Sequence, residues 1–177
     1  HDALPILAHE CSPWKQIYKN GRWKQKIMSK EIEKTSKLIY FVICYVFFIF
    51  ANLYMSSILV DKLVHGYKLS NAVFSLNYIK NTGAAFSILQ NSRELLIILS
   101  MIALVLLALH VIHHLKSISL KTCFFIALLS AGIAGNLHER IVYGFVRDYF
   151  QLNFVHFPIF NISDIFINIG VIALIIL

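Results

Sequence analysis

Residues 38–60, LIYFVICYVFFIFANLYMSSILV, decide the fold because this stretch of 23 residues contains no charged side chain. About 20 apolar residues are enough for a helix to cross the hydrocarbon core of a bilayer. The stretch is also longer than the 7–15-residue apolar core of a cleaved signal peptide. We therefore predict that it is a retained membrane-spanning helix.

The composition of the whole chain agrees with a membrane protein. Of its 177 residues, 58% are hydrophobic and 14% are charged, and the mean hydropathy is +0.70. Soluble domains contain about 25% charged residues. Such an apolar chain excludes a free soluble enzyme, and it also excludes a disordered protein, whose signature is low hydrophobicity.

Three further apolar stretches predict three further helices. The expected fold is an all-α membrane protein with four transmembrane helices, at about residues 38–60, 95–112, 122–142 and 161–177. We treat residues 28–177 as one four-span domain. Residues 1–27 are a polar extension that precedes Met28, and the sequence leaves open both its status and whether the chain is truncated at its other end.

Residues 67–92 have a different pattern from the apolar stretches. Phe74, Leu76 and Tyr78 alternate with polar neighbours, and the sequence Asn81-Thr82-Gly83 is typical of a turn. We therefore expect a small β-ribbon at about 67–92, which forms a cradle on the outer (periplasmic) face of the membrane.

Basic residues indicate the orientation of the chain. Lys30, Lys34 and Lys37 precede the first span, and Lys116 and Lys121 lie between the second and third spans. Links rich in Lys and Arg stay in the cytoplasm. Both termini are therefore expected in the cytoplasm. The net charge of +7 is assigned to orientation, because no nucleic-acid-binding motif is present.

The histidines and cysteines predict no metal site. His110, His113 and His114 share one helix face, but no carboxylate or cysteine accompanies them, so a solvated helix end is the favoured interpretation. Cys44 and Cys123 lie in apolar stretches, where a free thiol behaves as a small hydrophobic group. We expect no metal and no cofactor.

Two acidic residues stand out because carboxylates near hydrocarbon are costly and usually functional. Asp148 and Asp164 share the link between the third and fourth spans, so both must lie on the same membrane face. We expect neighbouring helix ends to bring them together. Two close carboxylates share one proton, which allows one to act as a base and the other as an acid in hydrolysis. The alternative is that each Asp caps a helix or pairs with Arg140 or Arg147.

Neighbouring polar residues favour the catalytic interpretation. Asn161 and Asp164 are spaced i, i+3, and Asn136 and Arg140 are spaced i, i+4, so each pair shares a helix face. A polar stripe of this kind in a membrane helix usually faces the interior of the bundle. The alternative role for such a stripe is helix–helix adhesion.

Four short motifs now identify a resemblance. The segments NTGAAFS at 81–87, GNLHER at 135–140, VRDY at 146–149 and FNISD at 160–164 resemble the N-T-G-A-A-F-S, G-N-x-x-D-R, V-x-D-[FY] and F-N-x-A-D blocks of the signal peptidase II family. Order and spacing agree over about residues 34–177. Glu139 replaces the usual Asp, and Ser163 the usual Ala.

The resemblance implies an aspartic endopeptidase of the bacterial cytoplasmic (inner) membrane, with its active site near the outer leaflet. It would remove signal peptides from diacylglyceryl-modified prolipoproteins by cutting just before the lipidated Cys. The implied partners are these substrates and membrane lipid, and the implied state is a monomer without metal or cofactor. The antibiotic globomycin would inhibit it.

The resemblance also assigns roles to single residues. Asp148 and Asp164 would be the catalytic pair. Residues expected to position the substrate and the pair are Asn81, Gly83, Asn136, Arg140, Asn161 and Asp61. Asp61 resembles the Asp of a D-Q-x-x-K block, although Lys62 and His65 replace the Gln and Lys of that block.

Three other functions remain as alternatives. A non-enzymatic proton-coupled transporter or channel subunit would use the same carboxylates as relay sites, but no repeated half-domains are visible. A Ser–Lys peptidase would use Ser56 or Ser57 with Lys62, but these serines lie in an apolar stretch without an oxyanion-hole motif. The substitutions around Asp61 and at Glu139 also allow an inactive family member.

Overall fold

The computed structural model of this protein describes residues 13–84 and 88–177, with side chains from residue 21 onward. Residues 1–12 of the polar extension and residues 85–87 of the first motif lie outside the described residues.

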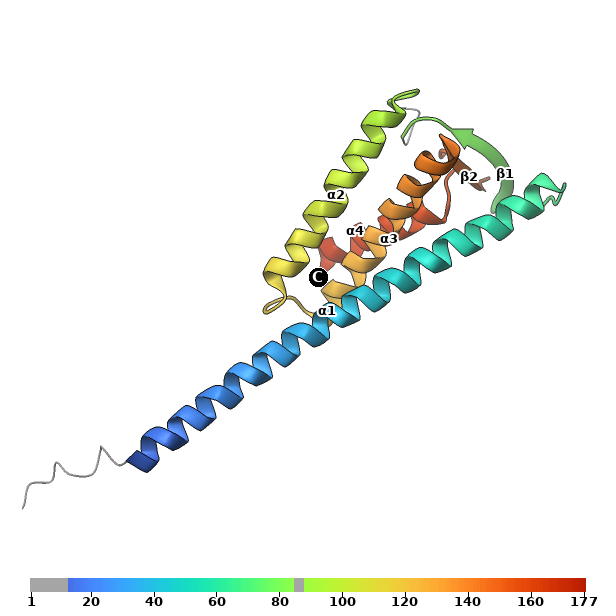
Figure 1. Cartoon of the computed structure of the whole chain (residues 1–177). Helices are drawn as coiled ribbons and strands as arrows, with labels where there is room; N and C mark the ends of the chain where they lie inside the picture. The colour runs from blue at the N-terminus through green and yellow to red at the C-terminus, as the bar shows by residue number, and fades with distance from the viewer. Residues whose placement is uncertain (1–12, 85–87) are drawn as a thin grey trace, which may run out of the picture.

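Four helices and two strands make up the described chain (Figure 1). The helices are α1 (Pro13–Val64), α2 (Arg93–His114), α3 (Leu120–Tyr143) and α4 (Ile162–Ile176). Residues 21–64 of α1, the whole of α2 and the whole of α3 are long and apolar enough to cross a membrane, and α4 is a shorter apolar helix of 15 residues. The prediction of a mainly helical membrane protein with four helices is confirmed.

Helix α1 extends far beyond the predicted first span. Its 52 residues run without a break from the polar extension through residues 38–60 to Val64 (Figure 1). Side chains in its basic part are mostly exposed, and Lys37 pairs with Glu33 at 2.8 Å along the helix. The later part of the extension is therefore continuous with the first span as a single helix.

The β-ribbon differs from the prediction in its second strand. Strand β1 (Phe74–Asn81) lies within the expected range, but it pairs antiparallel with β2 (Val146–Leu152), which we had predicted only as part of the outer link. The register runs from Phe74 opposite Leu152 to Asn81 opposite Val146, with an irregularity between Leu76 and Ile79. The ribbon therefore joins two distant parts of the chain.

The expectation that Asp148 lies at a helix end is wrong, because Asp148 is in β2. Gly144 causes this change of structure. It adopts φ 84° at the C-cap of α3, where its N–H donates to the carbonyl of Arg140. A left-handed residue ends a helix and redirects the chain, and glycine adopts it without strain.

Helix α3 lies at the centre of the bundle, in contact with α1, α2 and α4. Its approach to α4 is close: a Cβ on Gly132 would lie 2.6 Å from the carbonyl oxygen of Ser163, and a Cβ on Gly170 would lie 2.8 Å from Cβ of Leu129. Small residues at such contacts allow helix backbones to pack together in membranes.

Two apolar clusters lie at opposite ends of α3. One contains Val111, Leu115 and Cys123 around the link between α2 and α3. The other contains Val60, Tyr149 and Ile162, where the end of α1, strand β2 and the beginning of α4 meet. The bundle is therefore packed at both ends, and the ribbon is attached to only one of them.

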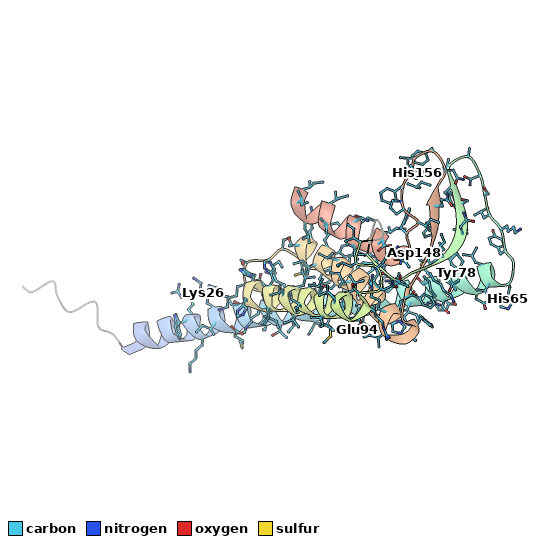
Figure 2. The ribbon with its side chains drawn as sticks, turned by 90° about the horizontal axis from the view of Figure 1, so that it is seen from above. Lys26, His65, Tyr78, Glu94, Asp148 and His156 are labelled. Atoms are coloured by element: carbon cyan, nitrogen blue, oxygen red, sulfur yellow. The ribbon has the colours of Figure 1, made fainter. Side chains whose placement is uncertain are left out.

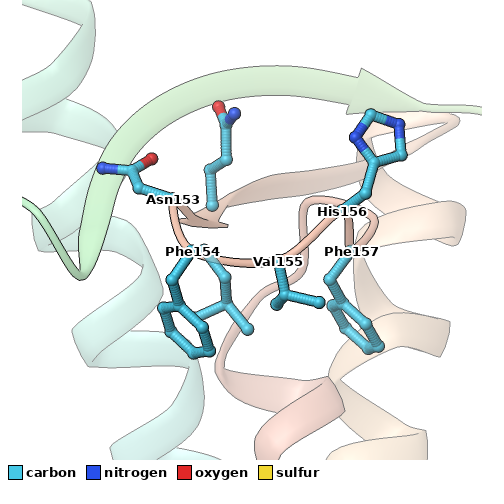
Figure 3. Close-up of a pocket in the computed structure, with 7 residues that line it drawn as sticks. Asn153, Phe154, Val155, His156 and Phe157 are labelled. Atoms are coloured by element: carbon cyan, nitrogen blue, oxygen red, sulfur yellow. The ribbon is translucent and has the colours of Figure 1, made fainter.

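The labelled side chains show which end of the molecule carries the ribbon. In Figure 2, Lys26 lies on the N-terminal half of α1, whereas Tyr78, Asp148, His156 and His65 lie toward the other end of the molecule. At that end, residues 151–157 line an open hollow of about 340 Å³ after β2 (Figure 3). The described residues of segments 61–84, 88–94 and 141–160 therefore share one end of the bundle.

Candidate active site

The two predicted catalytic aspartates are positioned by different kinds of structure. Asp148 lies in β2, and only 2% of its surface is exposed. Asp164 lies in the first turn of α4. There it forms a capping box with Asn161: the Asp164 amide donates to Asn161 Oδ1 at 3.0 Å, and the Asn161 amide donates to Asp164 Oδ2 at 3.1 Å. This reciprocal arrangement holds the Asp164 carboxylate at the beginning of its helix.

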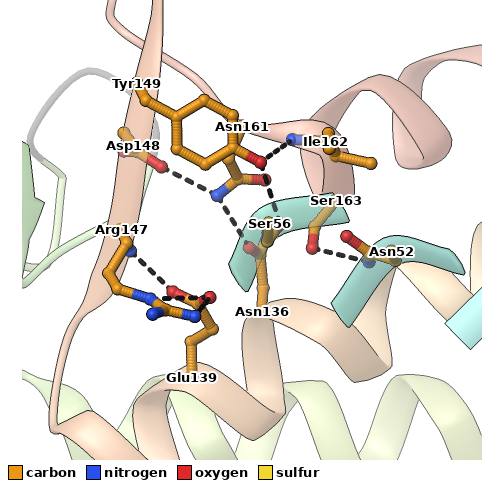
Figure 4. Close-up of polar contacts among 10 residues, drawn as sticks. All are labelled: Asn52, Ser56, Asn136, Glu139, Arg147, Asp148, Tyr149, Asn161, Ile162 and Ser163. Carbon is orange, nitrogen blue, oxygen red and sulfur yellow. Dashed lines mark hydrogen bonds and ion pairs between the residues drawn. The ribbon is translucent and has the colours of Figure 1, made fainter. Parts of the chain in front are cut away.

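Asn161 connects the two carboxyl groups. Its Nδ2 donates to Asp148 Oδ1 at 2.8 Å and to Asn136 Oδ1 at 3.1 Å (Figure 4). Asn136 in turn donates from Nδ2 to Asp164 Oδ1 at 2.9 Å. Asp148 and Asp164 thus belong to one hydrogen-bond network that joins β2, α3 and α4.

The loop after β1 closes the network from the other side. Asn81 Nδ2 donates to Asp148 Oδ2 at 2.9 Å, and Asn81 Oδ1 accepts from the amide of Gly83. Arg140 Nη2 donates to the carbonyl of Gly83 at 2.8 Å. A Cβ on Gly83 would lie 2.8 Å from the carbonyl oxygen of Ile88, so the loop requires glycine here. Asn81, Gly83 and Arg140 therefore meet at the site, as expected.

The alternative interpretation, in which each Asp caps a helix or pairs with an arginine, holds in one respect: Asp164 caps α4. In the described part of the chain, neither arginine forms an ion pair with the two aspartates. Arg147 instead pairs with Glu139: its Nη2 and Nε lie 2.6 and 3.0 Å from Glu139 Oε1, and its amide donates to Oε2 at 2.8 Å (Figure 4). Within residues 13–84 and 88–177, no ion pair joins Asp148 or Asp164 to an arginine. Neither carboxyl group is therefore neutralised by an arginine ion pair within these residues, although Asp164 also serves as the cap of α4.

Burial controls the protonation of Asp148. The pKa of its carboxyl is raised from 3.8 to about 7, mainly by loss of solvent and also by the nearby Asp164 carboxylate, and hydrogen bonds from Asn81 and Asn161 oppose this rise. Burial and a like charge both disfavour the ionised form of an acid. Near neutral pH, Asp148 therefore exists in both forms, as a proton donor in catalysis requires.

Asp61 lies apart from this network. It is in the last turn of α1 with its side chain 71% exposed, and its carboxylate lies 3.4 Å from Nδ1 of His65. The other five positioning residues of the prediction are in the network around the two aspartates: Asn81, Gly83, Asn136, Arg140 and Asn161.

Ser56 has a different partner from the one that a Ser–Lys peptidase needs. Its hydroxyl is buried and lies 2.8 Å from the hydroxyl of Tyr149, whereas Lys62 is exposed. The Tyr149 hydroxyl also accepts from the amide of Ile162 (Figure 4). Ser56 and Tyr149 thus join α1, β2 and the beginning of α4.

Sequence reasoning missed these supporting contacts. A second contact from α1 is Asn52, whose Nδ2 donates to the Ser163 hydroxyl at 2.9 Å. The available signal was the i, i+4 spacing of Asn52 and Ser56 inside an otherwise apolar helix, which places both on one face. The Glu139–Arg147 pair had no comparable signal, because the two residues lie on different elements.

Comparison with known proteins finds similarity to signal peptidases along most of the chain. The model of the family described as Signal peptidase (SPase) II matches residues 43–177. The chain is 37% identical over 105 residues to the lipoprotein signal peptidase of Streptococcus thermophilus (strain CNRZ 1066), a match that covers 59% of this chain and 68% of the relative. It is 41% identical over 104 residues to that of Lactococcus lactis subsp. lactis (strain IL1403), with 58% and 67% covered.

Solved structures show the same architecture. One bacterial membrane enzyme, solved by the in meso method at 2.3 Å resolution, superposes with a TM-score of 0.67 at 27% identity, over 77% of this chain and 85% of that one. A second, at 1.9 Å resolution, gives a TM-score of 0.64 at 28% identity, over 77% and 90% of the two chains.

Proposed function

Because the chain belongs to the signal peptidase II family, we propose that it cleaves prolipoproteins with Asp148 and Asp164 as its catalytic pair. As a member of this family it is an aspartic peptidase and a multi-pass bacterial membrane enzyme. This assignment replaces the transporter and Ser–Lys alternatives. The observation that carries the assignment of the pair is Asn161, which hydrogen-bonds to both carboxyl groups.

The pair would hold one proton between its two members. We assign this proton to Asp148, whose pKa burial raises to about 7. Asp164 then removes a proton from water, the water oxygen bonds to the carbonyl carbon of the scissile peptide, and Asp148 protonates the carbonyl oxygen. Collapse of the resulting diol breaks the C–N bond, and the pair returns a proton to the leaving nitrogen.

The surrounding residues would orient the pair and the substrate. Asn136, Asn161 and Asn81 donate one hydrogen bond each to carboxylate oxygens, which holds the carboxyl groups in fixed directions. Arg140 holds the Gly83 carbonyl, and so the loop that would cover the substrate. Asp61 would have only a peripheral place at the outer end of α1.

The proposed topology puts this site near the outer leaflet of the inner membrane. Lys116 and Lys121 lie at the end of the bundle opposite the ribbon, and a basic link of this kind favours the cytoplasm. Both termini would then be cytoplasmic, and residues 28–177 would form one monomeric four-span domain surrounded by lipid. A diacylglyceryl group on the substrate Cys would hold the scissile bond near headgroup depth, at the height of Asp148.

The test is a gel-shift cleavage assay with purified protein and a diacylated prolipoprotein. We expect cleavage by the native chain and inhibition by globomycin. Asp148→Asn and Asp164→Asn should each lower the rate by at least about 10²-fold, since each removes an acid–base group. Glu94→Gln, an exposed carboxyl at the beginning of α2, serves as the control and should keep full activity.

Membrane insertion and thermal unfolding of each variant are measured in parallel. Normal processing by either aspartate variant would refute the assignment of the pair. If an Asp148→Asn variant loses both activity and folding, Asp148→Glu is tested in its place, because it keeps the carboxyl group.

A further inference from the structure

The loop between β2 and α4 separates its polar and apolar side chains by direction. In Figure 3, Phe154, Val155 and Phe157 point to the side on which the helices of the bundle lie, whereas Asn153 and His156 point to the opposite side. The loop is therefore amphipathic, although it is neither a helix nor a strand.

The apolar side of the loop is largely uncovered. The exposed fractions of Phe154, Val155 and Phe157 are 67%, 47% and 45%. Residues 151–157, QLNFVHF, contain no Lys, Arg, Asp or Glu. Three large apolar side chains without a neighbouring charge form a surface that favours an apolar environment over water.

The rest of the loop is held in place, so the direction of these side chains is defined. The Phe157 ring contacts the Phe160 ring, with 5.8 Å between centroids, and the Phe150 amide donates to the Phe160 carbonyl. On the polar side, Asn153 Nδ2 donates to the carbonyl of Asn71 at 2.6 Å. The loop is thus fixed both to the beginning of α4 and to the segment before β1.

We propose that this loop is an interfacial membrane anchor, with Phe154, Val155 and Phe157 inserted into the outer leaflet and Asn153 and His156 facing water. Amphipathic segments bind at the boundary between headgroups and acyl chains through an apolar side that often carries Phe. The apolar side is turned toward the membrane-spanning helices (Figure 3), and residues 151–157 carry no charged side chain, which makes lipid the occupant that we assign.

This anchor would set the depth of the catalytic strand. The loop begins at Asn153, directly after β2, and β2 carries Asp148 five residues before Asn153. Lipid contact by the loop would therefore hold the Asp148 carboxyl at a constant height relative to the headgroups. The inference rests on the proposed topology and is independent of the peptidase activity.

The test measures depth with tryptophan. In a full-length chain with Trp14→Phe and Trp23→Phe, single Phe154→Trp and His156→Trp variants are reconstituted in vesicles whose lipids carry bromine near the top of the acyl chain. Bromine quenches tryptophan fluorescence on contact. We expect quenching at position 154 to be at least about threefold stronger than at position 156, because the two side chains point to opposite sides.

Two further variants make the result interpretable. Ile102→Trp, on the exposed surface of α2, should be quenched strongly by bromine placed deep in the chain and verifies insertion. Phe157→Trp repeats the test if Phe154→Trp does not fold. Equal quenching at 154 and 156 would overturn the proposal. A second result would also overturn it: tryptophan fluorescence at position 154 that bromine does not quench in vesicles and that becomes shielded only when substrate is added. The loop would then bind the peptide.

Discussion

Helices α2 and α3 are almost equal in length, 22 and 24 residues, but they lie in opposite environments. The most apolar stretch of α2 has a mean hydropathy of 3.0 and is 11% buried, whereas that of α3 has a mean hydropathy of 1.6 and is 56% buried. The less apolar helix is therefore the interior one, the reverse of what water would favour.

The lipid solvent explains this reversal. In a bilayer, an exposed apolar helix costs nothing, whereas each polar group needs a partner inside the protein. Helix α3 buries the side chains of Ser130, Asn136, Glu139 and Arg140, and three of these belong to the site or its support. In α2, the buried residues are Leu96 and Val111. The polar residues of α3 thus determine both its position and its function.

The contrast is tested most strongly by removing one arginine from each helix. Arg140→Gln removes the buried guanidinium that donates to Gly83, and a hydrogen bond from a charged group contributes about 1.5–3 kcal/mol. We expect the rate of cleavage to fall about 10- to 100-fold, as measured by kcat and KM in the gel-shift assay.

The matched variant is Arg93→Gln at the beginning of α2. Arg93 itself is exposed; its guanidinium donates to the carbonyl of Arg140 through a half-buried bond and to the carbonyl of Ile141 through an exposed one. Exposed contacts contribute little, so a loss below about threefold is expected. Equal losses in the two variants would break the contrast between the helices.

A second test uses pH. Because burial raises the pKa of Asp148 to about 7, cleavage that needs a protonated Asp148 should fall about tenfold for each pH unit above 7. Asn81→Ala removes a hydrogen bond that lowers this pKa, so its decline in kcat/KM should begin at higher pH.

The raised pKa of Asp148 also determines how the stability of the folded chain changes with pH. The folded chain keeps a proton on Asp148 that the unfolded chain, with an ordinary pKa of 3.8, has released. The free energy of unfolding should therefore decrease as pH rises from about 4 to about 7. Glu94→Gln in α2 should alter neither profile, and a shift of the pH profile by that variant would contradict the assignment to Asp148.

The smallest expected effect concerns helix packing. A methyl group at Gly132 would lie 2.6 Å from the carbonyl oxygen of Ser163, and overpacking of this kind typically costs 1–3 kcal/mol. Gly132→Ala should lower Tm by about 5 °C in micelles, measured by circular dichroism. Ala108→Val, on the exposed side of α2, should change Tm by about 1 °C or less. Similar shifts in both variants would show that α2 is packed as tightly as α3.

The spans and the first strand were predictable because their signals are local. Residues 38–60 exceed the length of a membrane crossing, and alternation from Phe74 to Tyr78 has the period of a strand. The second strand was missed because VRDYFQL lies between apolar helices, and its partner is more than 60 residues away. Pairing at that separation depends on the tertiary fold.

The candidate site divides in the same way. Connectivity alone put Asp148 and Asp164 on one membrane face, and the four motifs named their neighbours. The bond from the Asn161 backbone amide to Asp164 is local, at i, i+3 spacing. The bond from the Asn161 side chain to Asp148 could not be predicted, because it depends on the angle at which β2 meets α4. The partner of Arg147 could not be predicted either, because Glu139 lies on α3 and Arg147 on β2.

By itself, the order of residues determined the class of this protein. The apolar stretches have the length that a bilayer requires, and Asp148 and Asp164 lie in one link and so on one side of the membrane. Acidic residues near hydrocarbon would be costly without a function. Only the tertiary structure decided that Asp148 lies on a strand, that Asp61 stays outside the network and that α3 is enclosed. The physical reason is range. Hydrophobic length acts along one segment, whereas a hydrogen bond is made only when two separate segments meet within about 3 Å in a suitable direction.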